Sequence, residues 1–140
     1  MTTFEYATRE GGEEVALLLG VSVDEMMNCQ DWEYTFPKVD DLSRYQAIYD
    51  RKEVSDLAKR VLGCFIFESL EGYLRAGGSE SIVQIGLKRL AQDFYIHKEE
   101  FHDWALYDDE HYDLHPEDGW SLMPIVRDLL LEVENETDCN

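Results

Sequence analysis

Residues 53–76 read EVSDLAKRVLGCFIFESLEGYLRA, and this is the clearest helical stretch of the 140-residue chain. Its apolar side chains recur at the spacing of a helix that buries one face. They are Val54, Leu57, Ala58, Val61, Leu62, Phe65, Leu70, Tyr73 and Leu74. The pair Gly77-Gly78 follows directly and is typical of a break between helices. The stretch therefore predicts one long helix from Glu53 to Ala76.

Two further helices are predicted on the C-terminal side of this stretch. The first begins at a cap on Ser79 or Ser81 and packs antiparallel to the long helix, with Lys88 and Arg89 turned outward. Its expected buried stripe is Ile82, Ile85, Gly86, Leu90 and Phe94. The second spans Trp120 to Glu134, with a cap at Ser121, Pro124 in its first turn, and apolar residues at helical spacing. Those residues are Leu122, Ile125, Val126, Leu129, Leu130 and Val133.

The N-terminal third shows shorter elements. Residues 13–19 and 41–51 have helical patterns, and Ser22-Val23-Asp24-Glu25 matches a capping box that opens another helix. Residues 3–8 and 32–36 contain aromatic and β-branched side chains that would also suit short strands. We therefore expect a mostly α, compact, single-domain bundle of about five or six helices over residues 1–140, with frayed final residues. These two segments could add a short β-hairpin to the bundle near the N-terminus.

The sequence gives no sign of a membrane span, a secretory signal or a disulfide framework. Its longest apolar run, residues 61–67, is far shorter than the roughly 20 residues that a spanning helix needs. The N-terminus lacks a positively charged start followed by an apolar stretch. Cys29, Cys64 and Cys139 are odd in number and far apart, so reduced thiols are expected, with Cys64 in the core. These features predict a cytoplasmic protein.

The net charge of −19 is the most unusual property of the chain. Residues 1–37 carry −7 and residues 99–140 carry −13, whereas residues 38–98 carry +1. Charge of one sign opposes compaction, so we expect it to have a compensating role. That role is either solubility or recognition of a basic partner. Direct binding of nucleic acid is not expected, because no basic face stands out from the acids.

The segment from Glu99 to Asp118 is the leading candidate for a partner-binding surface. It holds nine carboxylates and four aromatic residues and contains no Lys or Arg. Carboxylates match Arg and Lys of a partner, and an aromatic ring can anchor the contact. The predicted contact residues are Trp104, Tyr107, Asp108, Asp109, Glu110 and Asp113, with Trp32 and Glu33 as a second patch. The alternative is an ordinary helix on which Phe101 and Trp104 face the core and the acids face water.

All four histidines, His97, His102, His111 and His115, fall in the same part of the chain. They suggest a metal site as a weaker alternative, although their spacing does not match the paired histidines of zinc hydrolases. Pro116 also favours an extended backbone at His115, which argues against a helical His111–His115 pair.

No motif in the chain specifies a reaction. The glycine-rich phosphate-binding patterns and the nucleophile motif Gly-x-Ser-x-Gly are missing, so we predict neither catalytic residues nor a cofactor. The leading hypothesis is an acidic inhibitor of a basic protein, most concretely a bacterial immunity protein that neutralises a nuclease toxin. The alternatives are a DNA mimic that blocks a restriction or defence protein, a small metal-binding protein or enzyme, and an acidic accessory subunit.

Overall fold

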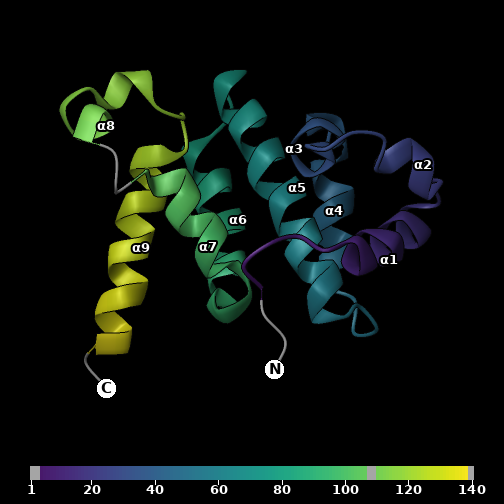
Figure 1. The fold of residues 1–140 in the computed structure, drawn as a ribbon. Coiled ribbons are helices and arrows are strands. Elements are labelled where there is room, and N and C mark those ends of the chain that lie inside the picture. Colours follow the sequence, from purple (N-terminus) through teal and green to yellow (C-terminus); the bar gives the residue numbers. More distant parts are fainter. Residues whose placement is uncertain (1–3, 107–109, 139–140) are drawn as a thin grey trace.

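The computed structural model describes residues 4–106 and 110–138 of the chain. Within these ranges the protein is all-helical, with nine α-helices, two short 3-10 helices and no strand (Figure 1). In chain order they are α1 (Arg9–Leu19), α2 (Val23–Met26), α3 (Trp32–Thr35), η1 (Val39–Asp41), α4 (Leu42–Tyr49), α5 (Asp56–Arg75), α6 (Glu80–Ala91), α7 (Phe94–Ala105), α8 (Glu110–Leu114), η2 (Pro116–Asp118) and α9 (Met123–Asp138). None of the described helices is both long and apolar enough to cross a membrane.

The predicted long helix is confirmed as α5, which lies at the centre of the fold. The helix begins after Ser55, whose hydroxyl accepts a hydrogen bond from the N–H of Ala58, and this cap explains why it starts later than Glu53. Every residue from Arg60 to Phe67 is buried, so α5 is enclosed over two turns. Helices α1, α3 and α4 pack against α5 at one side, and α6 and α7 pack at the other (Figure 1).

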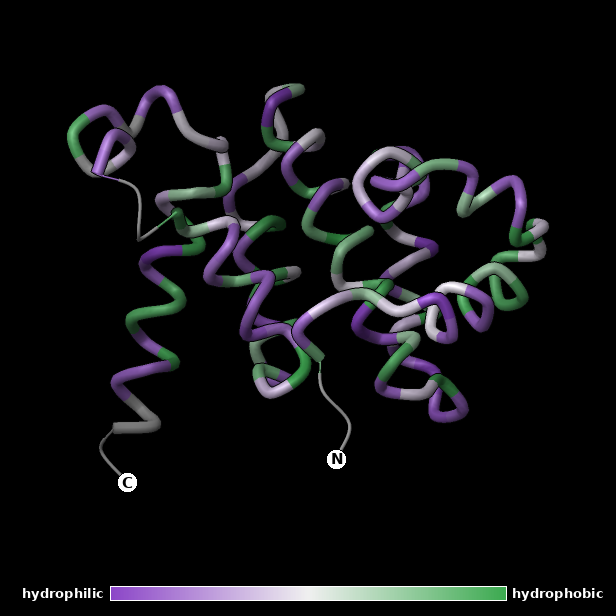
Figure 2. Tube along the Cα trace, in the orientation of Figure 1, coloured by the Kyte–Doolittle hydropathy of each residue, from purple (hydrophilic) through white to green (hydrophobic). Residues whose placement is uncertain are grey.

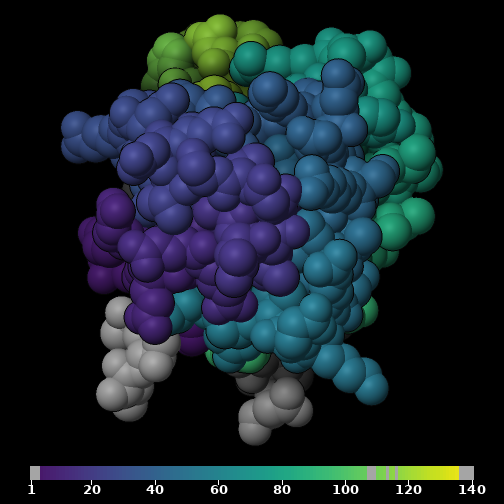
Figure 3. Space-filling view, turned by 90° about the vertical axis from the view of Figure 1, so that its right-hand side faces the viewer, coloured from purple at the N-terminus to yellow at the C-terminus, as the bar shows by residue number. Residues whose placement is uncertain are grey.

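The N-terminal helices cover most of the face seen in Figure 3, in purple and blue, with teal and green segments along its edges. At the opposite end, α9 packs on α7 and α6 and forms the outer edge of the bundle (Figure 1). Apolar residues alternate with polar ones along α9, as expected for a helix with one side on the core and the other in solvent (Figure 2).

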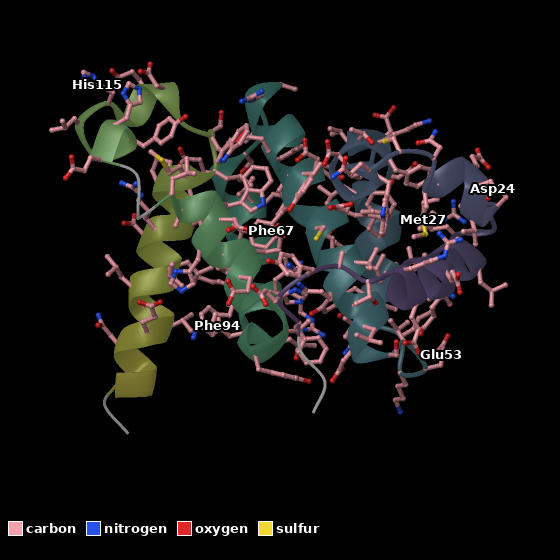
Figure 4. The ribbon with its side chains drawn as sticks, viewed as in Figure 1. Asp24, Met27, Glu53, Phe67, Phe94 and His115 are labelled. Carbon is pink, nitrogen blue, oxygen red and sulfur yellow. The ribbon has the colours of Figure 1, made fainter. Side chains whose placement is uncertain are left out.

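Two aromatic clusters form the core on either side of α5. Phe65 contacts Trp32, Phe36 and Tyr45, with ring centroids 5.4–6.2 Å apart. Phe67, labelled near the middle of Figure 4, contacts Phe101 edge-on at 5.1 Å and stacks on Trp104 at 5.9 Å. Burying a phenylalanine fully stabilises the fold by about 1.5–3 kcal/mol. Phe65 and Phe67, two residues apart and on opposite sides of α5, thus join the N-terminal helices to α7.

The predicted helix count and the predicted hairpin were wrong. Residues 32–35 form α3, where the carbonyl of Asp31 accepts hydrogen bonds from the N–H groups of Tyr34 and Thr35. Residues 4–8 contain no strand because the carbonyls of Phe4 and Glu5 bond to a side chain, that of Arg60. Two of the additional helices, α3 and α8, have four and five residues, which is too few for the periodicity of the sequence to reveal them.

The predicted buried stripe of α6 was also partly wrong. Ile82 is 49 % exposed and Ile85 is 70 % exposed. Gly86 and Leu90 are buried as predicted, but the other buried residues of α6 are Val83 and Leu87 in place of Ile82 and Ile85. Phe94 lies beyond the end of α6 and begins α7. The apolar pattern on α6 continues around the helix, so spacing alone could not select the buried side.

Charged side chains bind the backbone at the C-terminal end of α7 and at the N-terminal end of α9. The carboxylate of Glu71 accepts hydrogen bonds from the N–H groups of Ser121 and Leu122, both 3.0 Å long. Glu71 therefore takes the capping role at α9 that the sequence suggested for Ser121. At the other end of the connection, Arg127 donates to the carbonyls of Ala105 and Leu106, which end α7.

Candidate functional site

A buried polar cluster lies between α5 and α7, and the carboxylate of Glu100 is its centre. Glu100 is 1 % exposed. Its Oε1 atom pairs with the Arg60 guanidinium at 3.2 Å and accepts hydrogen bonds from the Tyr34 hydroxyl at 3.1 Å and the Cys64 thiol at 3.3 Å. Its Oε2 atom accepts a hydrogen bond from the Trp104 indole at 3.0 Å. A buried carboxylate needs such partners, and here both oxygens are satisfied.

Arg60 also fixes the N-terminal segment over this cluster. Its Nε atom donates to the carbonyl of Phe4 at 2.7 Å, and its Nη2 atom donates to the carbonyl of Glu5 at 3.0 Å. The Nη1 atom contacts the sulfur of Cys64 at 3.0 Å. Burial raises the pKa of the Cys64 thiol well above its usual value, and the nearby charge of Glu100 adds to this effect. Cys64 is therefore a protonated core residue and not a nucleophile.

His97 is the second titratable group of the same core. It is fully buried, and its Nε2 atom lies 2.7 Å from the Tyr49 hydroxyl, which also donates to Asp93 at 2.8 Å. The ring fits against Gly63, where a Cβ atom would come within 2.5 Å of it. Burial, assisted by the positive charge of Arg60, lowers the pKa of His97 to about 3. His97 is therefore neutral at physiological pH.

The structure does not bring the four histidines together. His97 lies in the core, and His102 on α7 contacts Glu134 on α9 at 3.0 Å. His111 and His115 lie on the surface at the far end of the molecule, where Figure 4 labels His115. Their rings are 5.1 Å apart, and His111 contacts Asp118 at 2.8 Å. Among the described residues, no group of three or more His, Cys, Asp or Glu side chains is arranged to hold a metal ion.

An acidic face lies at the surface beside the buried cluster. The acidic face consists of residues from the N-terminal segment, from α3 with the preceding Asp31, and from α7. Electrostatic interactions connect its members, which are Glu5, Tyr6, Asp31, Glu33, Tyr34, Glu99 and Asp103. Tyr6 is 71 % exposed and Tyr34 is 38 % exposed, so each phenol presents part of its ring to solvent. The hydroxyl of Tyr34 reaches inward to Glu100 and connects this face to the core.

Two carboxylates of the acidic face, Glu33 and Asp103, lie in an environment that disfavours their charged forms. Partial burial, together with the negative charges of Asp31 and Glu100, raises the pKa of Glu33. Partial burial and the charges of Glu100 and Glu99 likewise raise the pKa of Asp103. Arg60 acts against both effects, but its guanidinium is already paired with Glu100. A cation from outside the chain would therefore be attracted to this face.

Two of the predicted contact residues, Trp104 and Trp32, are wholly or partly buried. Trp104 is not the exposed anchor that the sequence suggested, because its indole is only 5 % exposed, stacks on Phe67 and donates to Glu100. Phe101 is fully buried too, so α7 fits the alternative of an ordinary helix on the core, apart from its buried Glu100. Trp32 is partly buried against Phe65.

The other predicted contact residues lie at the surface or outside the described part. Glu33 is partly exposed on α3, and Glu110 is exposed on α8. Tyr107, Asp108 and Asp109, and the side chain of Asp113, lie outside the described residues.

Sequence reasoning missed Tyr6, Tyr34, Glu99 and Asp103 as parts of one surface. The available signal was the aromatic and acidic content of residues 4–6 and 31–34, but nothing in the sequence shows that these segments meet α7. Comparisons with protein-family models, with curated proteins and with solved structures find no match to this chain. Function is therefore inferred from the geometry and charge of the chain itself.

Proposed function

We propose that this protein binds a basic protein through the acidic face and inhibits it. The most concrete version is a bacterial immunity protein that neutralises a nuclease toxin. The observation that supports this proposal is the pair of surface carboxylates, Glu33 and Asp103, whose pKa values are raised by partial burial and by neighbouring negative charges. Such carboxylates suit an inhibitor, because pairing with a cation of the target would stabilise their charged forms.

The chemistry of a nuclease explains why it would be a suitable target. Its active-site cleft is positively charged to hold phosphates, so carboxylates can occupy or flank the same cleft. The exposed rings of Tyr6 and Tyr34 add apolar contact area next to the charges. Long-range attraction would raise the association rate from roughly 10⁵–10⁶ to as much as about 10⁸–10⁹ M⁻¹ s⁻¹ at low salt.

A charge-reversal pair of variants tests the proposal. The first variant changes Glu33, Glu99 and Asp103 to Lys, and the control changes Asp24, Glu25 and Glu53 to Lys. All six residues lie at the surface, and both variants have the same net charge. Figure 4 labels Asp24 and Glu53 on the side of the molecule occupied by α1 and α2. Wild type and both variants are immobilised and exposed at low salt to lysate of the source organism.

We expect a basic protein to be retained by wild type and the control and lost from the acidic-face variant. The purified captured protein is then assayed for nuclease activity, which adding the wild-type protein should abolish. If both variants retain or lose the same proteins, the acidic face is not the binding site. If binding is instead competed by any duplex DNA and extends to unrelated DNA-binding proteins, the DNA-mimic alternative replaces the immunity hypothesis.

A further inference from the structure

A groove runs between α6 and α9, on elements that contribute nothing to the acidic face. Its volume is about 440 Å³. The α6 wall consists of Glu80, Gln84 and Lys88, which are four residues apart and so form one stripe along the helix. The α9 wall and floor consist of Pro124, Ile125, Asp128, Leu129 and Glu132. At 1.5 Å per residue the stripe on α6 is about 12 Å long, which corresponds to about two helical turns.

The groove combines an apolar floor with a negative rim. Leu129 is 8 % exposed and Ile125 is partly buried, so the floor already belongs to the core. Glu80, Asp128 and Glu132 are exposed, and none of them takes part in an ion pair or side-chain hydrogen bond with the described part of the chain. Lys88 supplies one positive charge against these three carboxylates. The rim is therefore short of cations.

We propose that this groove is a second docking surface, which takes a basic amphipathic helix from a partner protein. Two adjacent helices offer a channel into which the ridge of a third helix fits. Leucine-like side chains at positions i, i+3, i+4 and i+7 of the guest would lie over Ile125 and Leu129. Its Lys and Arg residues would flank that stripe and pair with Glu80, Asp128 and Glu132.

The rim charge decides between possible occupants. A second copy of this chain carries −19 itself and would place further carboxylates beside those of the rim. An apolar helix without basic flanks would leave the three carboxylates near an uncharged partner and remove part of their hydration. A guest with both an apolar stripe and flanking cations satisfies both parts of the groove.

A synthetic peptide of about 18 residues, with Leu at helical spacing and Lys elsewhere, serves as the probe. A peptide of the same composition in scrambled order measures attraction by net charge alone. The protein variants are Glu80→Lys/Asp128→Lys/Glu132→Lys in the groove and the Asp24→Lys/Glu25→Lys/Glu53→Lys control, which have equal net charge. Binding to the whole protein is measured by fluorescence anisotropy at low and physiological salt, and circular dichroism checks that each variant is folded.

We expect the amphipathic peptide to bind wild type and the control with Kd values within about twofold, and the groove variant at least about tenfold more weakly. The scrambled peptide should bind all three weakly. Equal binding of the two peptides, or equal losses in the two protein variants, would show that only net charge acts and would overturn the proposal. So would a stable dimer of the free protein in sedimentation that the groove substitutions dissociate. The acidic-face variant should keep full peptide binding, so this proposal can fail or succeed independently of the proposed function.

Discussion

Glu100 and Asp103 lie one turn apart on α7, yet their surroundings are opposite. Glu100 is buried and meets four donors, from Arg60, Cys64, Tyr34 and Trp104. Asp103 is at the surface, where partial burial and the neighbouring carboxylates raise its pKa. The same functional group is therefore part of the folded core at one position and an uncompensated charge at the next turn.

The comparison separates the charges that maintain the fold from the charges that are free to bind. Replacing a residue of the first kind should reduce stability, whereas replacing a residue of the second kind should reduce binding and relieve repulsion. Net charge alone cannot make this distinction, because every carboxylate counts equally toward −19.

The largest expected effect comes from removing the cation of the buried pair. Arg60→Met leaves Glu100 without its guanidinium and frees the carbonyls of Phe4 and Glu5. We expect a loss of about 3–5 kcal/mol in the free energy of unfolding, measured by urea denaturation. Arg9→Met, which removes an exposed pair with Glu13, should cost less than about 1 kcal/mol. Similar losses in the two variants would contradict the distinction between the two kinds of charge.

A smaller effect concerns the buried histidine and depends on pH. The folded-state pKa of His97 is about 3, below its usual value of 6.5. A histidine with a lowered pKa contributes stability above pH 6.5, and this contribution disappears as the pH falls toward 3. Protonation in the unfolded state should cost the wild type about 2 kcal/mol at pH 5.

Unfolding curves of wild type and His97→Gln at pH 7 and pH 5 measure this loss. The variant should lose less stability than wild type between the two pH values, although it is less stable at pH 7. His115→Gln, at an exposed histidine, is the control and should follow the wild type. Parallel pH profiles for wild type and His97→Gln would show that His97 titrates normally.

A substitution at Tyr34 tests the connection between the buried cluster around Glu100 and the acidic face. Tyr34→Phe removes the hydroxyl that donates to Glu100 but keeps the ring on the acidic face. We expect a loss of about 1 kcal/mol in stability, because one of the donors to a buried carboxylate is missing. Tyr6→Phe alters an exposed ring and should change stability by less than about 0.5 kcal/mol. A loss at Tyr6 as large as that at Tyr34 would show that the inward contact is unimportant.

The smallest expected effect is an increase in stability, whereas the preceding substitutions reduce it. Because the pKa of Asp103 is raised, the folded state disfavours its charged form, and this penalty applies above the folded pKa and disappears as the pH falls below the unfolded pKa. Asp103→Asn should therefore increase stability at pH 7 by about 0.5 kcal/mol or less, and the gain should vanish near pH 3. Glu53→Gln, at an exposed residue on the side of the molecule occupied by α1, is the control. Destabilisation by Asp103→Asn would mean that Asp103 has a structural partner.

The sequence predicts the helical class well and the candidate site poorly, for physical reasons. The stripe of α5 and the cap at Ser22 depend on neighbouring residues, and both are confirmed. The buried face of α6 depends on which helices surround it, and Ile82 and Ile85 were therefore misplaced. Trp104 shows the same limit, because its burial depends on Phe67, which is distant in the sequence.

The sequence contains one sign that Glu100 is buried. It stands three residues after His97 and four before Trp104, so a carboxylate interrupts a buried helical face. Its main partner, Arg60, lies on another helix, and no local pattern connects the two. Charge composition favours the proposed basic partner, but only the fold separates the buried carboxylates from those at the surface.

The two ends of the connection between α7 and α9 are fastened independently of what lies between them. Arg127 holds the carbonyls of Ala105 and Leu106, and Glu71 holds the N–H groups of Ser121 and Leu122. All four contacts are to backbone atoms, and both anchoring side chains belong to long helices. The exposed residues Glu110, His111 and Leu114 of α8 take no part in these four contacts, so replacing them would leave both anchors in place.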